Sequence, residues 1–499
     1  MMRVKVQEQR RAAVVFMTRV CIATVLPLMA CPIAHAQWQP DQRLTTDTSE
    51  SMYTITSAWS VATNHDTVHT VWRDKRDGNM EIYYKRSADG GKHWGPDIRL
   101  TEDSSTSSTA CIAVLGLRVH VAWNDSRDGN SEIYYKRSLD GGEHWEADVR
   151  LTQDTAISGT ASLATANSMV HAVWRERHDG PDGEIYYMRS TDEGAHWCSA
   201  VRLTNNPAYT LNPTIAVSDS IVHVLWNDSR DGNRKIYYKR STNAGVSWGS
   251  DERLTNDRFT SQLPSVAVSG SNVHAVWTDF RNGNYEIYYK RSADGGMNWG
   301  TDTRLTTSMD TSMWSSIAVS GSTVHVVWQD DRESTDDIFY KKSTDGGTHW
   351  EADTRISNNG ATSSERPTVA VSDSAVHVVW MDRRDGPNGE IYYKRNPTGN
   401  IPGALNRILP AAEHGVLLQT YPNPTHISAT IRYSLSHTMN VRVTVRDILG
   451  FVVATPVDAP QHAGMYEVPF DARSLARGMY LCTLETNGHV VHTLMAAIR

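Results

Sequence analysis

Cysteine is scarce in this chain, and no long apolar run follows the N-terminal segment. Five cysteines occur in 499 residues, and only Cys111, Cys198 and Cys482 lie beyond residue 36. This odd number, scattered over two regions, does not indicate a disulfide framework, so stability must come from packing. Because a membrane-spanning helix needs about 20 apolar residues, the chain beyond residue 36 offers no transmembrane candidate.

An excess of basic residues is also missing. The net charge is −7, and the first 36 residues hold five basic residues but one acidic residue, Glu8. Without that segment the net charge is −11. This balance argues against nucleic acid or an anionic membrane surface as the main partner.

The first 36 residues carry the features of a secretory signal peptide. Basic residues from Arg3 to Arg19 precede an apolar run from Val20 to Ala34, and Ala34-His35-Ala36 predicts cleavage after Ala36. The apolar run of 15 residues is short for a membrane span. The segment Leu28-Met29-Ala30-Cys31 leaves one alternative, lipidation at Cys31, although Met29 fits a lipoprotein cleavage site poorly.

One repeated unit fills most of the chain. Its tryptophan recurs every 51 or 52 residues, as Trp72, Trp123, Trp174, Trp226, Trp277, Trp328 and Trp380. In the second copy, the apolar runs Val119–Trp123 and Glu132–Arg137 flank an Asp-Gly turn, which predicts a β-hairpin. The runs Cys111–Leu115 and Asp148–Thr152 supply two more strands. Four strands in roughly 40 to 50 residues predict the blades of a β-propeller.

The ends of the repeat region predict a closed ring of seven blades. Residues Trp38–Thr45 match only the last strand of a unit, and the seventh unit, Val376–Arg395, lacks that strand. The N-terminal strand is therefore expected to complete the last blade and to remove its exposed edge. Beyond the repeat, the alternating runs that predict a β-sandwich are Thr430–Leu435, Val441–Asp447, Tyr466–Phe470, Met479–Glu485 and His489–Met495. The expected all-β organisation is a signal peptide at 1–36, a propeller at 37–396, a linker at 397–416 and a sandwich at 417–499.

A motif in the repeat resembles the Asp box of sialidase-type propellers with BNR repeats. Ser87-x-Asp89-x-Gly91-x-x-Trp94 recurs from Ser138, Ser190, Ser241, Ser292 and Ser343, with Asn243 replacing Asp in the fourth copy. The resemblance implies a structural turn between the third and fourth strands of a blade, facing away from the ligand side. It identifies a fold and not an activity.

Residues 417–499 resemble the C-terminal sorting domain of type IX secretion cargo. The matching motifs, in order, are Tyr421-Pro-Asn-Pro424, Thr430–Leu435, Val445–Gly450, Ala463-Gly464 and Leu475–Tyr480. The resemblance implies the type IX secretion machinery as a partner. It also implies export through the periplasm to the cell surface or the medium.

Two repeated features suggest metal binding, but each has a structural alternative. A histidine recurs in every blade, as His69, His120, His171, His223, His274, His325 and His377. Adjacent sheets pack about 10 Å apart, too far for these side chains to share an ion, so hydrogen-bonded packing is favoured. In the hairpin from Asp125 to Glu132, Arg127 is expected to pair with both acids. We predict neither a metal nor a cofactor.

Positions where the copies disagree are candidates for a ligand site. Before the innermost strand of each blade, the copies carry Ser57-Ala58, Ser108-Thr109, Gly159-Thr160, Leu211-Asn212, Gln262-Leu263, Met313-Trp314 and Glu365-Arg366. We expect these pairs in loops around the axial mouth, with Asn212, Gln262, Trp314, Glu365 and Arg366 binding the ligand. Their amides, carboxylate, guanidinium and indole suit a sugar, and Arg366 would favour an acidic one. Neutral drift in solvated loops is the open alternative.

The sequence thus favours an exported propeller that binds a glycan or glycoprotein on its axial face. One alternative is an exo-glycosidase such as a sialidase, which needs an arginine cluster beside an acid/base carboxylate. The sialidase pattern is not found, because Arg43-Leu44-Thr45 is a strand encoded by the repeat, and the catalytic residues stay unknown. The other alternative is a protein-interaction scaffold.

Overall fold

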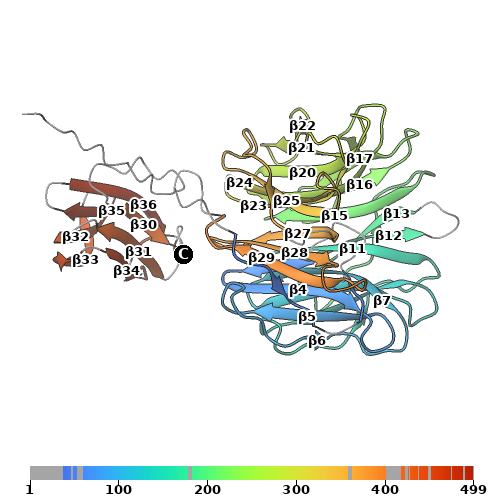
Figure 1. Cartoon of the computed structure of the whole chain (residues 1–499), viewed down its shortest axis with the longest axis horizontal. Coiled ribbons are helices and arrows are strands. Elements are labelled where there is room, and N and C mark those ends of the chain that lie inside the picture. Colours follow the sequence, from blue (N-terminus) through green and yellow to red (C-terminus); the bar gives the residue numbers. More distant parts are fainter. Residues whose placement is uncertain are drawn as a thin grey trace, which may run out of the picture.

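The computed structural model describes residues 38–46, 49–52, 60–177, 183–357, 362–400 and, with short gaps, 417–497. Every regular element in these ranges is a β-strand, and the strands form the predicted propeller and C-terminal sandwich (Figure 1). No helix in this part of the chain is long and apolar enough to cross a membrane. The expected signal peptide, with Cys31, and linker residues 401–416 lie outside the described residues.

The second blade shows how one repeat folds. Strands β7 (Ser107–Leu115), β8 (Arg118–Asp125), β9 (Glu132–Ser138) and β10 (Val149–Arg150) pair antiparallel in chain order. The predicted hairpin is confirmed, with Asp125 opposite Glu132. Its turn contains Gly129 at a φ of 96°, which glycine adopts without strain. The buried Trp123 indole N–H donates to the Asp125 carboxylate at 2.8 Å, which ties the second strand to the turn.

The remaining blades repeat this sheet. Blade 1 has β2 (Ser51–Met52) and β3 (Val61–Asn64), both paired with β4 (Thr67–Asp74), then β5 (Glu81–Ser87) and β6 (Ile98–Arg99). Blades 3 and 4 contain β11 (Ile157–Ala166), β12 (Met169–Arg177), β13 (Glu184–Ser190), β14 (Val201–Arg202), β15 (Thr210–Ser218), β16 (Ile221–Asp228), β17 (Lys235–Ser241) and β18 (Glu252–Arg253). Blades 5 and 6 contain β19 (Ser261–Ser269), β20 (Asn272–Asp279), β21 (Glu286–Ser292), β22 (Thr303–Arg304), β23 (Ser312–Ser320), β24 (Thr323–Asp330), β25 (Asp337–Ser343) and β26 (Thr354–Arg355).

The ring is closed as predicted. Blade 7 consists of β27 (Ser364–Val371), β28 (Val376–Asp382), β29 (Glu390–Asn396) and the N-terminal β1 (Gln42–Arg43). Arg43 lies opposite Tyr392, and its guanidinium is 2.5 Å from the Glu390 carboxylate. The innermost strands of all seven blades line one central channel of about 240 Å³, with one alanine from each blade: Ala62, Ala113, Ala164, Ala216, Ala267, Ala318 and Ala370.

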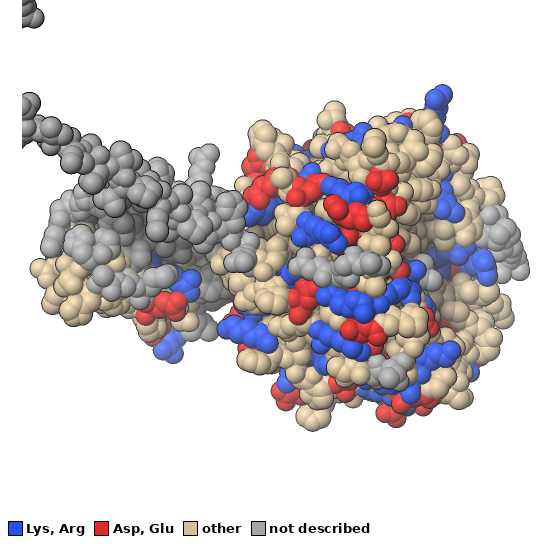
Figure 2. Space-filling view, viewed as in Figure 1, with Lys and Arg blue, Asp and Glu red and all other residues tan. Residues whose placement is uncertain are grey.

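One predicted ion pair of the hairpin is wrong. Arg127 pairs with Asp125 at 2.6 Å, as expected, but its other two carboxylates are Asp103 and Asp148, each at 2.8 Å. Glu132 pairs with Arg150 at 2.8 Å. The reason is the fourth strand, which brings Arg150 onto the same side of the sheet as Glu132. Similar pairs recur around the ring, and Figure 2 shows basic and acidic side chains interspersed over one side of the propeller.

In blades 1 to 6, the turn between the third and fourth strands fastens the blade to its neighbour. In blade 2 the Ser138 hydroxyl donates to Asp140, and the Asp140 carboxylate accepts the His144 backbone N–H at 2.9 Å. Trp145 then packs edge-on against Tyr84 of blade 1, with ring centroids 4.9 Å apart. These contacts give the turn the structural role that the resemblance implied.

The repeated histidines are hydrogen-bonded packing residues, as predicted. His120 is 2% exposed, and its Nδ1 lies 2.6 Å from the Tyr135 hydroxyl. Burial lowers the pKa of His120 to about 3, and the charges of Arg137 and Arg118 act in the same direction. This histidine is therefore neutral at ordinary pH.

The C-terminal region is a sandwich of two antiparallel sheets. One contains β30 (Leu417–Tyr421), β31 (Ser428–Leu435) and β34 (Gly464–Asp471), and the other contains β33 (Val452–Gln461), β32 (Met439–Arg446), β35 (Gly478–Thr486) and β36 (His489–Ala497). Buried side chains from both sheets, among them Ile431, Val443 and Leu484, form one core. The sequence predicted the positions of β31, β32, β34, β35 and β36 but missed β30 and β33.

Candidate functional site

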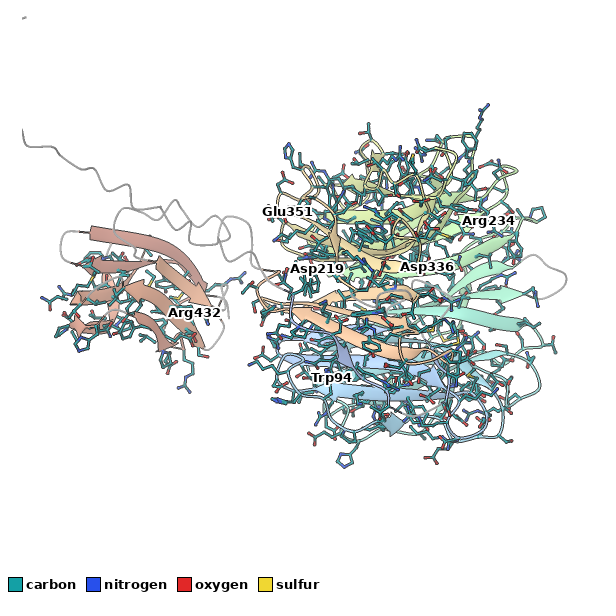
Figure 3. All side chains as sticks on the ribbon, in the orientation of Figure 1. Trp94, Asp219, Arg234, Asp336, Glu351 and Arg432 are labelled. Carbon is teal, nitrogen blue, oxygen red and sulfur yellow. The ribbon has the colours of Figure 1, made fainter. Side chains whose placement is uncertain are left out.

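The residues that differ between blades gather at one end of the propeller. Because successive strands alternate in direction, the first strand begins, the second ends and the third begins at the same end, which we call the axial mouth. In Figure 3, Arg234 and Asp336, which precede third strands, lie toward one end, whereas Trp94 and Glu351, which follow third strands, lie toward the other. Strand β29 ends at Asn396, so the chain leaves the propeller at the end opposite the mouth.

The variable pairs lie inside the innermost strands, so their expected place in loops was wrong. The register with the second strand shifts at each described pair, for example between Ser108 and Cys111, which marks a β-bulge. The second residue of each described pair has a left-handed backbone with φ between 52° and 57°: Thr109, Thr160, Asn212, Leu263, Trp314 and Arg366. Since a bulge re-aims side chains within a paired strand, these pairs are buried or half-buried.

Blade 1 departs from this pattern. In blade 1, Met52 pairs with Arg73, the residue after the repeated tryptophan. In blade 2, Ser108 pairs with the equivalent Asn124. Met52 therefore occupies the position assigned to Ser57 from the sequence. The innermost strand of blade 1 resumes at Val61, which is equivalent to Ile112 of blade 2. Between Met52 and Val61, blade 1 has five residues more than blade 2 has between Ser108 and Ile112. Ser57-Ala58 fall within this insertion and outside the described residues.

Three of the predicted residues come together where blades 6 and 7 meet. The Arg366 guanidinium lies over the Trp314 ring, 5.3 Å from its centroid. The backbone N–H of Arg366 donates to the Gln329 side chain at 3.1 Å. Glu365 accepts a hydrogen bond from Arg383, also at 3.1 Å. This geometry combines an aromatic face with a guanidinium at the mouth.

Two further arginines, Arg73 of blade 1 and Arg383 of blade 7, complete an arginine cluster with Arg366. Burial lowers the pKa of Arg366; the Glu365 carboxylate opposes this shift, and the charges of Arg73 and Arg383 add to it. Burial also lowers the pKa of Arg73. Among the described residues, the buried Arg366 Nη1 has no hydrogen-bond partner. Glu365 partly offsets the charge of Arg383, and Glu50 that of Arg73. Three neighbouring guanidinium groups, with the Arg366 Nη1 left to donate, favour a bound anion.

An acidic side chain with a raised pKa lies beside this cluster. Burial raises the pKa of Asp336, a hydrogen bond with Gln329 opposes the rise, and the charges of Glu365, Asp331 and Asp337 add to it. Gln329 thus links Asp336 to the backbone of the arginine cluster. A carboxyl group that keeps its proton to higher pH is suited to donate that proton.

The other two predicted residues lie on different blades. Asn212, on β15, donates to Asn227 at 3.1 Å. Gln262, on β19, accepts a hydrogen bond from Arg234 at 2.7 Å. The structure therefore divides the five predicted residues into one group on blades 6 and 7 and another on blades 4 and 5.

The missed residues occupy repeat columns that vary between blades. Arg383 lies three positions after the repeated tryptophan, where the other blades have Lys75, Ser126, Arg177, Ser229, Phe280 and Asp331. The position after the repeated tryptophan holds Arg73, Asn124, Arg175, Asn227, Thr278, Gln329 and Met381, and the position before the third strand holds Met80, Ser131, Gly183, Arg234, Tyr285, Asp336 and Gly389. A comparison of every column would have found them. The insertion in blade 1 was visible as a longer interval between Leu44 and Trp72 than in the later copies.

The mouth therefore offers guanidinium groups, amides, an indole ring and a protonatable carboxyl group. Within the described ranges, no three histidine, cysteine, aspartate or glutamate side chains gather closely enough to hold a metal ion. These groups suit the recognition of a polar, anionic ligand and, at Asp336, proton transfer to it.

Comparison with solved structures supports the fold. The chain is similar to a polysaccharide lyase described as an ulvan lyase of family PL25, with 11% identity, 69% of this chain and 94% of that chain covered, and a TM-score of 0.51. It is also similar to the polysaccharide lyase Uly1, with 10% identity, 72% and 99% coverage, and a TM-score of 0.50. At these identities the likeness shows the propeller fold alone. No curated protein matches the chain.

The family comparison identifies the C-terminal region. Residues 419–496 match the secretion system C-terminal sorting domain. The protein is thus an exported β-propeller. More particularly, it is a propeller whose C-terminal sandwich is a type IX secretion sorting domain, as the sequence motifs implied.

Proposed function

We propose that the axial mouth binds an acidic glycan. The observation that carries this proposal is the arginine cluster beside Trp314, in which Arg366 is half-buried and stacked on the indole. Guanidinium groups bind carboxylates and sulfates by charge-assisted hydrogen bonds, and an aromatic face packs against the C–H face of a sugar. The two similar solved propellers are polysaccharide lyases, which agrees with a glycan as the ligand.

The test replaces the stacked pair and measures binding. Trp314→Gly/Arg366→Gly should weaken binding to acidic sugars on a glycan array by at least about tenfold, because a hydrogen bond to a charged group contributes about 1.5 to 3 kcal/mol. Glycine keeps the left-handed backbone at both positions without strain.

The matched control is Thr109→Gly, the same backbone change in blade 2, which should bind like the wild type. Equal binding by the double variant and the wild type would refute the proposal. Binding to a partner protein, with no glycan bound on the array, would instead favour an interaction scaffold.

A second candidate function is glycan cleavage, with Asp336 as the proton donor. The supporting observation is the raised pKa of Asp336 next to the arginine cluster, the combination that an exo-glycosidase needs. Turnover should fall as pH rises through this raised pKa, because the donor is then deprotonated. Asp336→Asn should abolish the release of fluorophore from a sialoside or of new chain ends from acidic polysaccharides, while binding persists. Absence of turnover by the wild type would leave binding as the function.

A further inference from the structure

A second group of cations lies at the mouth on blades 3 to 5. Arg175, near the end of β12, and Arg234, just before β17, both lie over the Tyr209 ring, with guanidinium carbons 4.9 and 5.8 Å from its centroid. Gln262 of blade 5 fixes Arg234 by the 2.7 Å hydrogen bond. We call Arg175, Tyr209, Arg234 and Gln262 the blade 3–5 group.

The backbone of blade 3 is shaped to hold Arg175. A Cβ atom at Gly183 would stand 2.2 Å from the Arg175 Nε, so a larger residue would push the guanidinium away. Gly183 immediately precedes the third strand, where blades 1 and 2 have Met80 and Ser131. Blade 3 thus combines a glycine before the third strand with an arginine after the repeated tryptophan, whereas blade 1 has Arg73 with Met80 and blade 7 has Met381 with Gly389.

Blade 4 adds positive charge at the same place. The third strand begins with a buried acid in the other blades, as Glu81, Glu132, Glu184, Glu286, Asp337 and Glu390, whereas blade 4 has Lys235, which is 2% exposed. The Lys235 amine donates to the Phe259 carbonyl and lies 3.8 Å from Asp257. Exchange of an acid for a base beneath Arg234 makes the local potential more favourable to an anion.

We infer that the blade 3–5 group is a second anion subsite, and that the ligand is a linear glycan with acidic groups on two or more sugars. This inference rests on the proposed function of the mouth. Blade 4 and blade 7 are three positions apart in the ring, and neighbouring sheets pack about 10 Å apart. One acidic sugar does not reach from Arg234 to Arg366, whereas an extended chain that crosses the mouth does. Blade 2, which presents the neutral Ser108 and Asn124, separates the two groups on one side of the ring, and blades 5 and 6 adjoin on the other.

The test measures how affinity depends on the length of the glycan. The full chain is titrated with oligogalacturonates and chondroitin sulfate oligosaccharides, from disaccharide to decasaccharide, in a calorimeter. The wild type should gain at least about tenfold in affinity once the chain spans both subsites, because the second contact is then intramolecular. Arg175→Ala/Arg234→Ala should lose this gain and keep its affinity for the disaccharide. Arg366→Gly should weaken binding at every length.

Two controls separate this inference from the proposed function. Lys92→Ala/Arg118→Ala removes two positive charges from the opposite end of the propeller and should keep the gain. Arg234→Ala alone, which leaves Arg175 against Gly183, should also lose most of the gain and serves if the double variant does not fold. A gain that survives either Arg234 variant overturns the second subsite and leaves the proposed function standing. A wild type that binds no acidic probe of any length overturns both.

Discussion

At the scale of single residues, the mouth is built on strained backbone. Six residues of the bulges have φ between 52° and 57°, and none is glycine. A left-handed backbone at such a residue costs on the order of 1 to 3 kcal/mol and is worst for β-branched side chains. Trp314 and Arg366 are among the six, so the strain coincides with the side chains that carry the proposed site.

Thr160 provides the test of this strain. It is β-branched, has a φ of 54°, and its buried hydroxyl has no hydrogen-bond partner among the described residues. Thr160→Gly should therefore stabilise the propeller by about 1 kcal/mol, because it relieves the backbone strain and removes a buried hydroxyl that has no hydrogen-bond partner among the described residues. Thermal unfolding measures the effect. Asn212→Gly is the control and should not stabilise the propeller, because asparagine tolerates this backbone and the variant loses the hydrogen bond to Asn227. A lower melting temperature for the Thr160 variant would show that the hydroxyl has a stabilising partner.

At the scale of elements, the short β1 strand has a large role because it closes the ring. Its backbone pairs with β29, and Leu44, which follows it, is 3% exposed. Asp41, which precedes it, is 2.7 Å from both Arg384 and Lys394. These contacts join the first described residues of the chain to its seventh blade.

Deletion of residues 37–45 should lower the free energy of unfolding by several kcal/mol, more than the usual 0.5 to 3 kcal/mol of a point change. The deletion exposes the edge of β29, takes Arg43 and Thr45 away from Glu390, and takes Asp41 away from Arg384 and Lys394. Urea unfolding of the truncated and complete chains measures the loss. Asp41→Asn, which keeps the strand, should cost much less. An unchanged unfolding midpoint after the deletion would show that β1 does not stabilise the ring.

At the scale of the whole molecule, the repeat places a buried histidine with a lowered pKa in each of the seven blades. Burial lowers the pKa to about 3 for His69, His120, His325 and His377 and to about 4 for His171, His223 and His274. In the unfolded chain these histidines have a pKa near 6.5. Between about pH 6.5 and 4 the unfolded chain therefore binds more protons than the folded one, and stability falls as the pH falls.

We expect the propeller to lose stability steeply below about pH 6. Each histidine contributes on the order of 1.4 kcal/mol per pH unit within this window. Urea midpoints measured from pH 7 to pH 4.5 test the slope. The variant His223→Gln should show a shallower slope by one proton, since glutamine does not titrate. A stability that is constant over this range would mean that the histidines are protonated in the folded state.

The sequence by itself determined the architecture of this protein. The spacing of Trp72 to Trp380 fixed the number of blades, and the split unit at Trp38–Thr45 fixed how the ring closes, because a repeat buries the same face each time. The C-terminal motifs fixed the sorting domain. The strand β33 was missed because its side chains are mostly exposed or half-buried, so it lacks the apolar alternation of a core strand.

The candidate site was decided by the tertiary structure. A single repeat column pointed to Arg366 and Trp314, but only closure of the ring brings Arg73, near the start of the repeats, to Arg383, at their end. Likewise, Glu132 forms its ion pair with Arg150 and not with Arg127, because the fourth strand lies beside the third. The repeated sequence pattern predicts how strands pair within one blade. The charge clusters at the mouth combine side chains of different blades, whose proximity depends on the curvature and closure of the whole ring.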